Sequence, residues 1–350
     1  MEWLVFLLTG GLIKLTNFSL LPIEGFMNIL ELPFDQYQRY KITEEVINII
    51  RWAGQKFKIL DAGGHPGLIN EFLLEDDTFV VDKLECDIPN FQKADILDLP
   101  FSDGYFDIVT SVDVLEHIPP EKRERFLGEL WRVSKEYVLI AAPFDNPNVS
   151  QADRILFEFI RVKLGYSHHF LDEHISYRLP NKDATINSLC RMGADTFSIP
   201  NGNLSRWLPM MIALFYMDID PQFNKLQKLI NSFYNENYYK IDNCKPCYRY
   251  AVVASKEELK ELTVSKLQGL ISLNNKNKDS YIDFSPVLAL IELFNLDMIK
   301  EKEGQINNLQ HSVKEKDIQI SILKEFERKV KSTLLYKMYR YLRLYKIYNK

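Results

Sequence analysis

The chain has 350 residues, of which 46% are hydrophobic and 26% charged, and its formal net charge is −5. This length and composition are typical of one large folded domain with an appendage, and the mildly acidic balance gives no reason to expect nucleic acid as a partner. Four cysteines are too few for a disulfide framework, so we expect free thiols in a reducing cytoplasm.

The N-terminal segment is apolar. Residues 3–13 form a run about as long as the hydrophobic part of a signal peptide, and too short to span a bilayer comfortably. Glu2 is acidic where a signal peptide carries basic residues, and no small-residue cleavage site follows. We therefore expect residues 1–26 to lie outside the functional domain, which would begin near Met27. A membrane anchor is the alternative.

A strand and a glycine-rich turn are predicted over residues 58–67. The apolar run ends in Asp61, and residues that can start a helix follow the turn. Glycine lets a ligand approach bare backbone and bond to N–H groups at the start of a helix. The pattern indicates the nucleotide-binding corner of a doubly wound α/β domain, although a tight turn without a ligand would use similar residues. The glycines of the turn are Gly63, Gly64 and Gly67.

Further strands of the same kind follow along the chain. Apolar runs at 79–82, 105–111 and 137–142 predict strands, and the charged segment 120–133 predicts a helix before the last of them. The stretch between Asp82 and Gln92 is short for a crossover helix and is interrupted by Pro89, so a loop is predicted there instead.

The region after residue 142 is where substrate choice is expected, because ligands of open α/β sheets bind beyond the carboxyl ends of the strands. Helices are predicted at 151–166 and 182–192, and an antiparallel pair of strands at 196–200 and 248–255. Two insertions, 151–195 and 203–247, are expected to bind substrate, the second as a helical lid. Cys244 and Cys247 form a lone C-x-x-C without a second pair or a histidine pair at zinc spacing, so no metal site is expected.

The C-terminal third differs in character. A polar stretch at 274–279 predicts a linker within a helical connection at 258–295. Apolar residues then recur every seven positions over 296–330, with a second series between them that two lysines interrupt. This pattern predicts a short coiled coil and self-association, or a single helix folded back on the domain. The series are Ile299, Ile306, Val313 and Ile320, and Leu309, Leu323 and Val330, interrupted by Lys302 and Lys316.

The chain ends in a basic aromatic tail, 331–350. Residues 328–350 hold eight Lys or Arg, no acid, and several tyrosines interleaved with apolar residues. Such a helix suits an anionic membrane surface. A phosphate-binding strip or a disordered tail would show the same charge.

Four motifs in order carry a resemblance to a known family. They are Asp-x-Gly-x-x-Pro-Gly at 61–67, a strand-end acid at Asp82, ADILDLPFSDGYFDIV at 94–109 and SVDVLEHI at 111–118. Together they resemble a class I S-adenosylmethionine-dependent methyltransferase of the type 11 group. The resemblance covers residues 42–142 closely and continues to 255. It implies a doubly wound, Rossmann-like seven-stranded sheet over 27–257 and S-adenosylmethionine as the cofactor.

The resemblance also implies roles for individual residues. Asp61 would orient the glycine loop and attract the ammonium group of the cofactor, directly or through water. Asp82 would accept both ribose hydroxyls, and Asp95 the adenine amino group, while the N–H of Ile96 donates to a ring nitrogen. The remaining expected contacts come from the glycine loop and from the end of the fourth strand, and they are Gly63, Gly64, His65, Gly67, Ser111 and Val112.

His65 departs from the family pattern, which usually has glycine at this position. A side chain here predicts a slightly different hold on the cofactor, weaker affinity or a degenerate site. The Gly-x-Gly-x-x-Gly pattern of nicotinamide-binding domains is absent from this turn, which argues against that cofactor.

Methyl transfer to a hydroxyl benefits from a general base. His117 is the first candidate, because it is expected at the start of the helix after the fourth strand. His174 is the second, and His168 or His169 the third. A surface or packing histidine is the alternative for each.

Three later segments suggest a narrower relationship. FLDEHISYRLP, NGNLSRWL and CKPCYRYAVVAS, followed by a coiled coil and a basic end, resemble methyltransferases of prokaryotic surface-polysaccharide and glycosyltransfer pathways. The resemblance implies a cytoplasmic enzyme, peripheral at the inner membrane face, that O-methylates a sugar or lipid-linked glycan. A methyltransferase for a small metabolite or quinone-like lipid, and a catalytically degenerate scaffold that recruits glycosyltransferases, are the alternatives.

Overall fold

The computed structural model describes residues 28–272 and 285–348, and the chain divides into two units, residues 1–283 and 284–350. The expected N-terminal segment 1–26 and the polar linker 274–279 lie outside the described residues.

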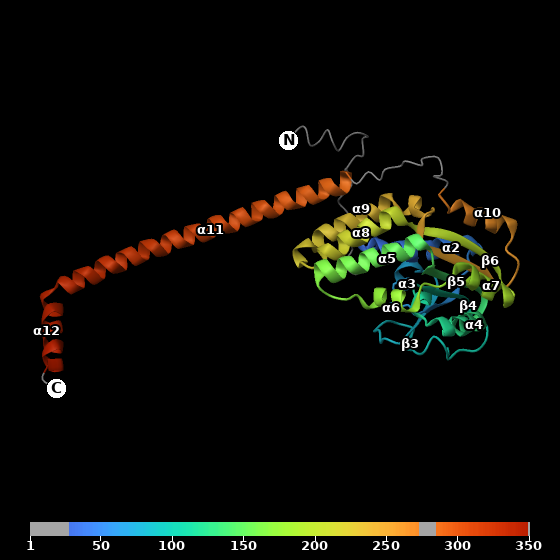
Figure 1. Cartoon of the computed structure of the whole chain (residues 1–350), viewed down its shortest axis with the longest axis horizontal. Helices are drawn as coiled ribbons and strands as arrows, with labels where there is room; N and C mark the ends of the chain where they lie inside the picture. Colours follow the sequence, from blue (N-terminus) through green and yellow to red (C-terminus); the bar gives the residue numbers. More distant parts are fainter. Residues whose placement is uncertain (1–27, 273–284, 349–350) are drawn as a thin grey trace. The chain divides into compact units, whose positions relative to one another are not determined.

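The first unit is built on a seven-stranded sheet with the order β3-β2-β1-β4-β5-β7-β6 (Figure 1). The first five strands are parallel, and β7 runs antiparallel to both β5 and β6. This arrangement confirms the predicted doubly wound sheet and its antiparallel pair. The strands are β1 Lys58–Ala62, β2 Asp77–Asp82, β3 Phe91–Lys93, β4 Phe106–Val112, β5 Ser134–Pro143, β6 Asp195–Asn203 and β7 Cys247–Ser255.

Helices cover both faces of the sheet, which explains the nearly continuous apolar runs of the central strands. On one face, α2 (Phe34–Ile50), α3 (Ile69–Phe72) and α10 (Glu261–Gly269) enclose one apolar cluster. On the other face, α4 (Arg123–Val133) and α7 (Lys182–Arg191) enclose a second. Both α4 and α7 confirm helices predicted from the sequence.

The connections around the first two strands are short. The glycine turn leads into α3, a helix of four residues. This helix is shorter than segment 68–74, whose residues can start a helix. Strand β2 runs to β3 through residues 83–90 without a helix, as Pro89 predicted. The parallel strands β1, β2 and β3 therefore bring their carboxyl ends to one rim within a few residues of chain.

The two insertions are helical. The first contains α5 (Pro147–Phe159), a π-helical turn (Ile160–Leu164) and α6 (His169–Tyr177). The second contains α8 (Leu204–Met217) and α9 (Asn224–Asn237), which confirms its predicted helical character. Helix α5 packs against α6 and α8, and α8 packs against α9 (Figure 1). Single-turn 3₁₀ helices lie at Ile29–Glu31, Leu115–His117, Pro120–Lys122, Pro221–Phe223 and Tyr239–Asp242.

The second unit consists of two helices, α11 (Ser285–Ser332) and α12 (Leu334–Tyr348). Helix α11 begins inside the segment expected to be a linker and continues through the whole predicted coiled coil. The apolar residues of both heptad series, here called the α11 seam, are exposed along it. Among the helices of the described residues, none combines the length and apolar character needed to cross a membrane.

Candidate active site

The glycine turn after β1 is held close to the neighbouring strands. The N–H of Gly63 donates to the carbonyl of Val81 at 2.7 Å. Gly63 has φ +82°, and a Cβ placed on it would lie 2.6 Å from Cγ2 of Val114. Gly67 has φ +92°, and a Cβ there would meet the side chain of Ile88. Both positions therefore require glycine, because positive φ and close packing each exclude a side chain.

Asp61 lies beneath this turn and is fully buried. Its carboxylate accepts hydrogen bonds from Thr110 Oγ1 at 2.9 Å and from the hydroxyl of Tyr40 at 3.3 Å. A Cβ on Gly64 would meet the same carboxylate. Burial raises the pKa of Asp61 to about 6. Asp61 therefore lies directly beneath the loop that it is expected to orient, and its contact with the cofactor ammonium, directly or through water, stays a prediction.

Asp82 fixes the loop from the next strand. Its carboxylate accepts the N–H of His65 at 3.2 Å and the N–H of Leu84 at 2.9 Å. The side chain of His65 is exposed, and the non-glycine residues with positive φ in the described part of the chain are others. His65 therefore neither needs the conformational freedom of glycine nor fills the space beside the loop.

The remaining expected cofactor contacts lie on the same rim. Asp95 follows β3, accepts the N–H of Leu97 at 3.0 Å and lies 4.0 Å from Nζ of Lys83. Its side chain is half exposed, whereas the side chain of Ile96 is buried. At the end of β4 the hydroxyl of Ser111 donates to the carbonyl of Ala62 at 3.1 Å. Ser111 and the adjoining Val112 are both buried, so these two residues can offer a ligand only their backbone.

A buried charge network follows β4, and sequence reasoning missed it. The fully buried Arg249 lies 2.9 Å from Asp113 and 2.7 Å from Asp35, and Arg39 lies 2.6 Å from Asp113. Burial alone would raise the pKa of Asp113, but Arg249 and Arg39 lower it to about 2. The sequence signal for this network was Arg249, the single arginine inside the apolar strand 247–255, because a buried arginine needs a partner of opposite charge.

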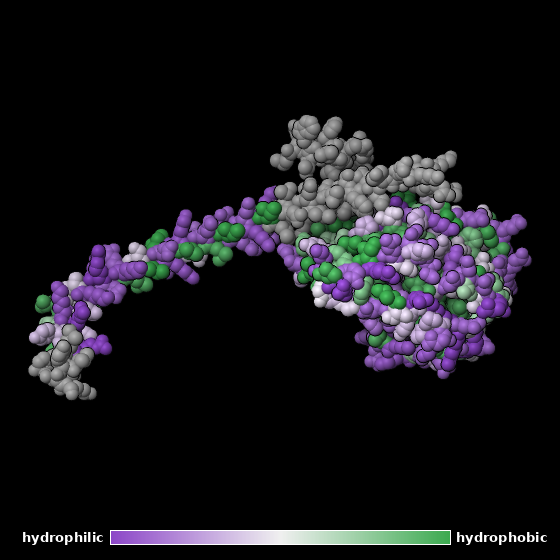
Figure 2. Space-filling view, in the orientation of Figure 1, coloured by the Kyte–Doolittle hydropathy of each residue, from purple (hydrophilic) through white to green (hydrophobic). Residues whose placement is uncertain are grey.

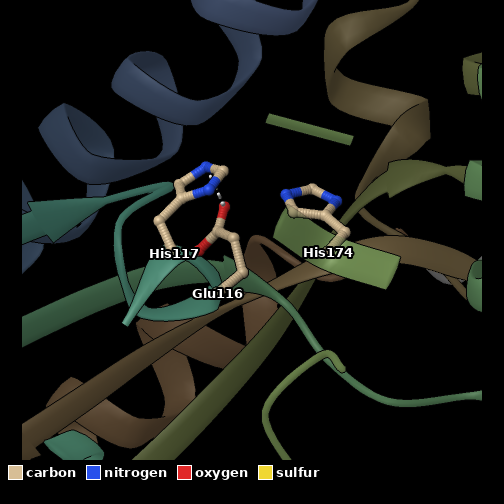
Figure 3. Close-up of side chains that lie close together, drawn as sticks. All are labelled: Glu116, His117 and His174. Atoms are coloured by element: carbon tan, nitrogen blue, oxygen red, sulfur yellow. Dashed lines mark ion pairs between the residues drawn. The ribbon is translucent and has the colours of Figure 1, made fainter. Parts of the chain in front are cut away.

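Two histidines meet next to this network (Figure 3). His117 belongs to the 3₁₀ helix Leu115–His117, not to the start of α4 as expected, and His174 comes from α6. Their ring centroids are 5.0 Å apart. Burial and the proximity of His174 lower the pKa of His117 to about 3. Glu116 points to the same place, and burial raises the pKa of its carboxyl group. The fold therefore brings together the two preferred catalytic candidates.

Each histidine lies beside a carboxylate that sequence reasoning did not identify. Nδ1 of His174 is hydrogen-bonded to Oδ2 of Asp153 at 2.9 Å, whereas Nδ1 of His117 lies 2.8 Å from Oε2 of Glu173 without a hydrogen bond to it. Asp153 also accepts a hydrogen bond from the hydroxyl of Tyr248 at 2.9 Å. The signal for Asp153 was an acid on the apolar face of the helix predicted at 151–166.

The three segments with the narrower resemblance converge at this point. The ring of Trp207 stacks on Tyr248 with a centroid separation of 3.5 Å, and its Nε1 donates to Asp35 at 2.8 Å. Trp207 comes from NGNLSRWL, Tyr248 from CKPCYRYAVVAS and His174 from FLDEHISYRLP. A continuous set of contacts thus links the Arg249 network to His174.

The third pair of candidates, His168 and His169, lies at the edge of this cluster. The ring centroid of His168 is 5.1 Å from that of Phe215, and the largely exposed His169 lies 3.5 Å from Glu173. Cys244 and Cys247 are free thiols, and Sγ of Cys244 donates to the carbonyl of Ile241 at 3.3 Å.

Part of the first unit is similar to known proteins. Residues 75–141, which include β2, β3, β4 and most of β5, match a family described as a methyltransferase domain. An S-adenosylmethionine-dependent methyltransferase from Archaeoglobus fulgidus is 17% identical, with 62% of this chain and 94% of that chain covered and a TM-score of 0.36.

Two further solved structures are similar to this chain. Magnesium protoporphyrin IX methyltransferase from Synechocystis, with S-adenosylhomocysteine bound, is 12% identical over 64% of this chain and 86% of its own, with a TM-score of 0.39. A 1,6-didemethyltoxoflavin-N1-methyltransferase from Burkholderia thailandensis is 12% identical over 63% and 80%, with a TM-score of 0.36. The matched segment is similar to a methyltransferase domain over residues 75–141, and the observed strand order places this segment within the parallel part of the sheet.

Proposed function

We propose that this enzyme transfers the methyl group of S-adenosylmethionine to a hydroxyl oxygen of a sugar on a lipid-linked glycan. The observation that carries the proposal is the pair of neighbouring histidines, His117 and His174, beside the end of β4, with His174 hydrogen-bonded to Asp153. A hydroxyl must lose its proton as it attacks the methyl carbon. A site for such an acceptor therefore needs a group that accepts the proton or stabilises the negative charge on the oxygen.

His174 is the better candidate for the base. Its Nδ1 is held by Asp153, which is itself held by Tyr248, so its Nε2 is left to face an acceptor. A base oriented by a third group in this way is typical of proton-transferring sites. His117, with a pKa lowered to about 3, is neutral at pH 7 but a weak proton acceptor. This reverses the order expected from the sequence.

The lipid-linked nature of the acceptor is supported by exposed apolar side chains on the insertions. Figure 2 shows hydrophobic residues gathered on the surface over α5 and α8. Such patches mark interaction sites on proteins that otherwise keep apolar groups scattered. The exposed large apolar residues of α5, the π turn, the loop after it, α6, α8 and the turn after α8 are Ile155, Val162, Tyr166, Phe170, Ile175, Tyr216 and Ile219.

The basic end of the chain also supports a lipid-linked acceptor. Helix α12 carries exposed Leu334, Leu335, Met338, Tyr339 and Leu342 together with lysines and arginines. Apolar and basic groups on one helix attract it to an anionic membrane surface. We propose that α12 keeps the enzyme close to lipid-linked acceptors and that the α11 seam pairs two copies of the chain.

Two measurements test the proposal. Calorimetry with S-adenosylmethionine is expected to show binding, and the folded chain showing none would favour the scaffold. Transfer of labelled methyl groups is then compared between a lipid-linked sugar extract and a quinone-precursor extract, and label only in the quinone products would reject the sugar acceptor. His174→Ala is expected to lose about 10²–10⁴-fold in rate, while His311→Ala, which removes an exposed imidazole from α11, serves as the matched control.

A further inference from the structure

We infer that Glu116, His117 and His174 form a binding site for one divalent transition-metal ion. One possible ligand atom from each residue lies within 4.8 Å of the other two. The three come from two packed elements, the 3₁₀ helix after β4 and α6. Figure 3 shows their side chains converging from these two elements. No metal site was expected from the sequence, because the residues are 58 positions apart at most and follow no known ligand spacing.

Unsatisfied buried atoms point to a missing partner at this place. The side chains of Glu116 and His174 are 1% and 8% exposed. Oε2 of Glu116 and Nε2 of His174 are buried and have no hydrogen-bond partner among the residues that the structure describes. A buried polar atom left unpaired costs about 1–3 kcal/mol. A cation bound between these atoms would remove both penalties at once.

The outer contact of His174 matches that of a metal ligand. A ligating histidine usually presents its second ring nitrogen to a carboxylate, which fixes the ring and increases its basicity. The ring of His174 does so here, because its Nδ1 is hydrogen-bonded to Asp153 at 2.9 Å. Nδ1 of His117 lies 2.8 Å from Oε2 of Glu173 but has no hydrogen-bond partner among the described residues. Glu116, His117 and His174 therefore each leave one buried polar atom unpaired at the same place, which favours a shared ion.

The donor set selects the class of metal. Two imidazole nitrogens and one carboxylate suit zinc and its neighbours in the first transition row, whereas magnesium and calcium prefer oxygen ligands. Asp113, three residues before Glu116, is not available as a fourth ligand because Arg39 and Arg249 already occupy its carboxylate. Three protein ligands leave a coordination position open, as in catalytic zinc sites.

The role of the ion rests on the proposed function. An acceptor hydroxyl bound at the open position would have a lowered pKa and would release its proton to solvent. The oxygen then attacks the methyl carbon, the carbon–sulfur bond breaks with its electron pair left on sulfur, and S-adenosylhomocysteine leaves. With the ion bound, Nε2 of His174 is a metal ligand, so the role of base proposed above for His174 applies only to the metal-free protein.

The test uses the full chain, without an affinity tag, after treatment with EDTA and dialysis. Calorimetry with Zn²⁺ and visible absorption with Co²⁺ are expected to show one ion per chain, with a cobalt spectrum typical of mixed nitrogen and oxygen ligands. Glu116→Gln and His174→Ala are each expected to weaken binding by at least about 10-fold, and Asp153→Asn by about 10–100-fold. The control variants Glu124→Gln and His311→Ala change an exposed carboxylate and an exposed imidazole. Both should bind Zn²⁺ and Co²⁺ with the affinity of the wild type.

Failure of the metal site can be told apart from failure of the proposed function. Absence of Zn²⁺ and Co²⁺ binding in a chain that still binds S-adenosylmethionine would overturn the site and leave the sugar methyltransferase intact. Unchanged stoichiometry and affinity in Glu116→Gln and in His174→Ala would overturn it equally. Metal binding that these two variants lose, without methyl transfer to the sugar extract, would support the site and reject the acceptor.

Discussion

Replacing Asp113 with asparagine tests whether the buried charge network holds the site together. Asp113 lies between Arg39 and the fully buried Arg249, at 2.6 Å and 2.9 Å. Its backbone has φ +52°, a conformation that asparagine adopts about as readily as aspartate. The substitution therefore removes one negative charge with little change in shape or backbone preference, and any loss of stability reports on the ion pairs.

The size of the effect follows from the pKa of Asp113. Arg249 and Arg39 lower it to about 2 against the opposing effect of burial, compared with about 3.9 in an unfolded chain. The ionised carboxylate thus contributes about 2 kcal/mol to folding at neutral pH. Because the folded-state pKa is the lower one, this contribution is complete above the unfolded-state pKa and is lost as the pH falls from about 4 towards 2.

Loss of the carboxylate also leaves Arg249 without full compensation. Breaking a buried ion pair on one side costs about 3–5 kcal/mol. We therefore expect Asp113→Asn to lower the free energy of unfolding by about 2–5 kcal/mol, which for a domain of this size lowers Tm by about 4–20 °C. Urea titration and thermal unfolding, each followed by circular dichroism at pH 7, measure the two quantities.

The control is Asp103→Asn, which breaks a pair with Arg132 at 3.0 Å whose aspartate side chain is 82% exposed. An exposed pair of this kind contributes at most about 1 kcal/mol. If Asp113→Asn is no less stable than Asp103→Asn at pH 7, the network is not what stabilises this region. The same conclusion follows if the gap between wild type and Asp113→Asn fails to narrow when the pH is lowered below 4.

Three further predictions concern the cofactor loop and the second unit. Gly64→Ala should abolish S-adenosylmethionine binding in calorimetry, because its methyl group meets the carboxylate of Asp61 under the loop. Retained binding would contradict that packing. The control His65→Ala, which removes an exposed side chain, should bind S-adenosylmethionine normally. Val313→Glu combined with Ile320→Glu places charges in the exposed α11 seam and should convert a self-associated chain to monomers in light scattering, whereas an unchanged mass would rule out pairing through the seam. Deletion of 328–350 removes eight basic residues, each worth about 1 kcal/mol at an anionic surface, so vesicle co-sedimentation should drop sharply; equal sedimentation would exclude this tail as the attachment.

The central sheet could be predicted because its physical cause is local. Strands β1, β4 and β5 are covered on both faces, so each reads as an unbroken apolar run. The glycine turn could be predicted for the same reason, since Gly63 and Gly67 occupy positive φ. Their conformation is a property of single residues and is visible without any knowledge of the tertiary structure.

The charge network and the histidine cluster could be predicted only in part, because their contacts join residues far apart in the chain. Asp113 pairs with Arg249 across 136 positions, and Tyr248 with Asp153 across 95. No spacing rule relates such pairs, so the sequence identified the histidines but not the carboxylates behind them. His117 was placed on the wrong element because a 3₁₀ turn of three residues has no periodicity to read.

Residues 111–117, which are the end of β4 and the turn after it, contact both the glycine turn and the histidine pair. Ser111 bonds to the end of β1, and Val114 packs where a side chain on Gly63 would otherwise lie. Only two residues further on, Glu116 and His117 face α6 and His174. Because residues 111–117 contact both the glycine turn and α6, a shift of this segment is expected to displace the glycine turn and the histidine pair together.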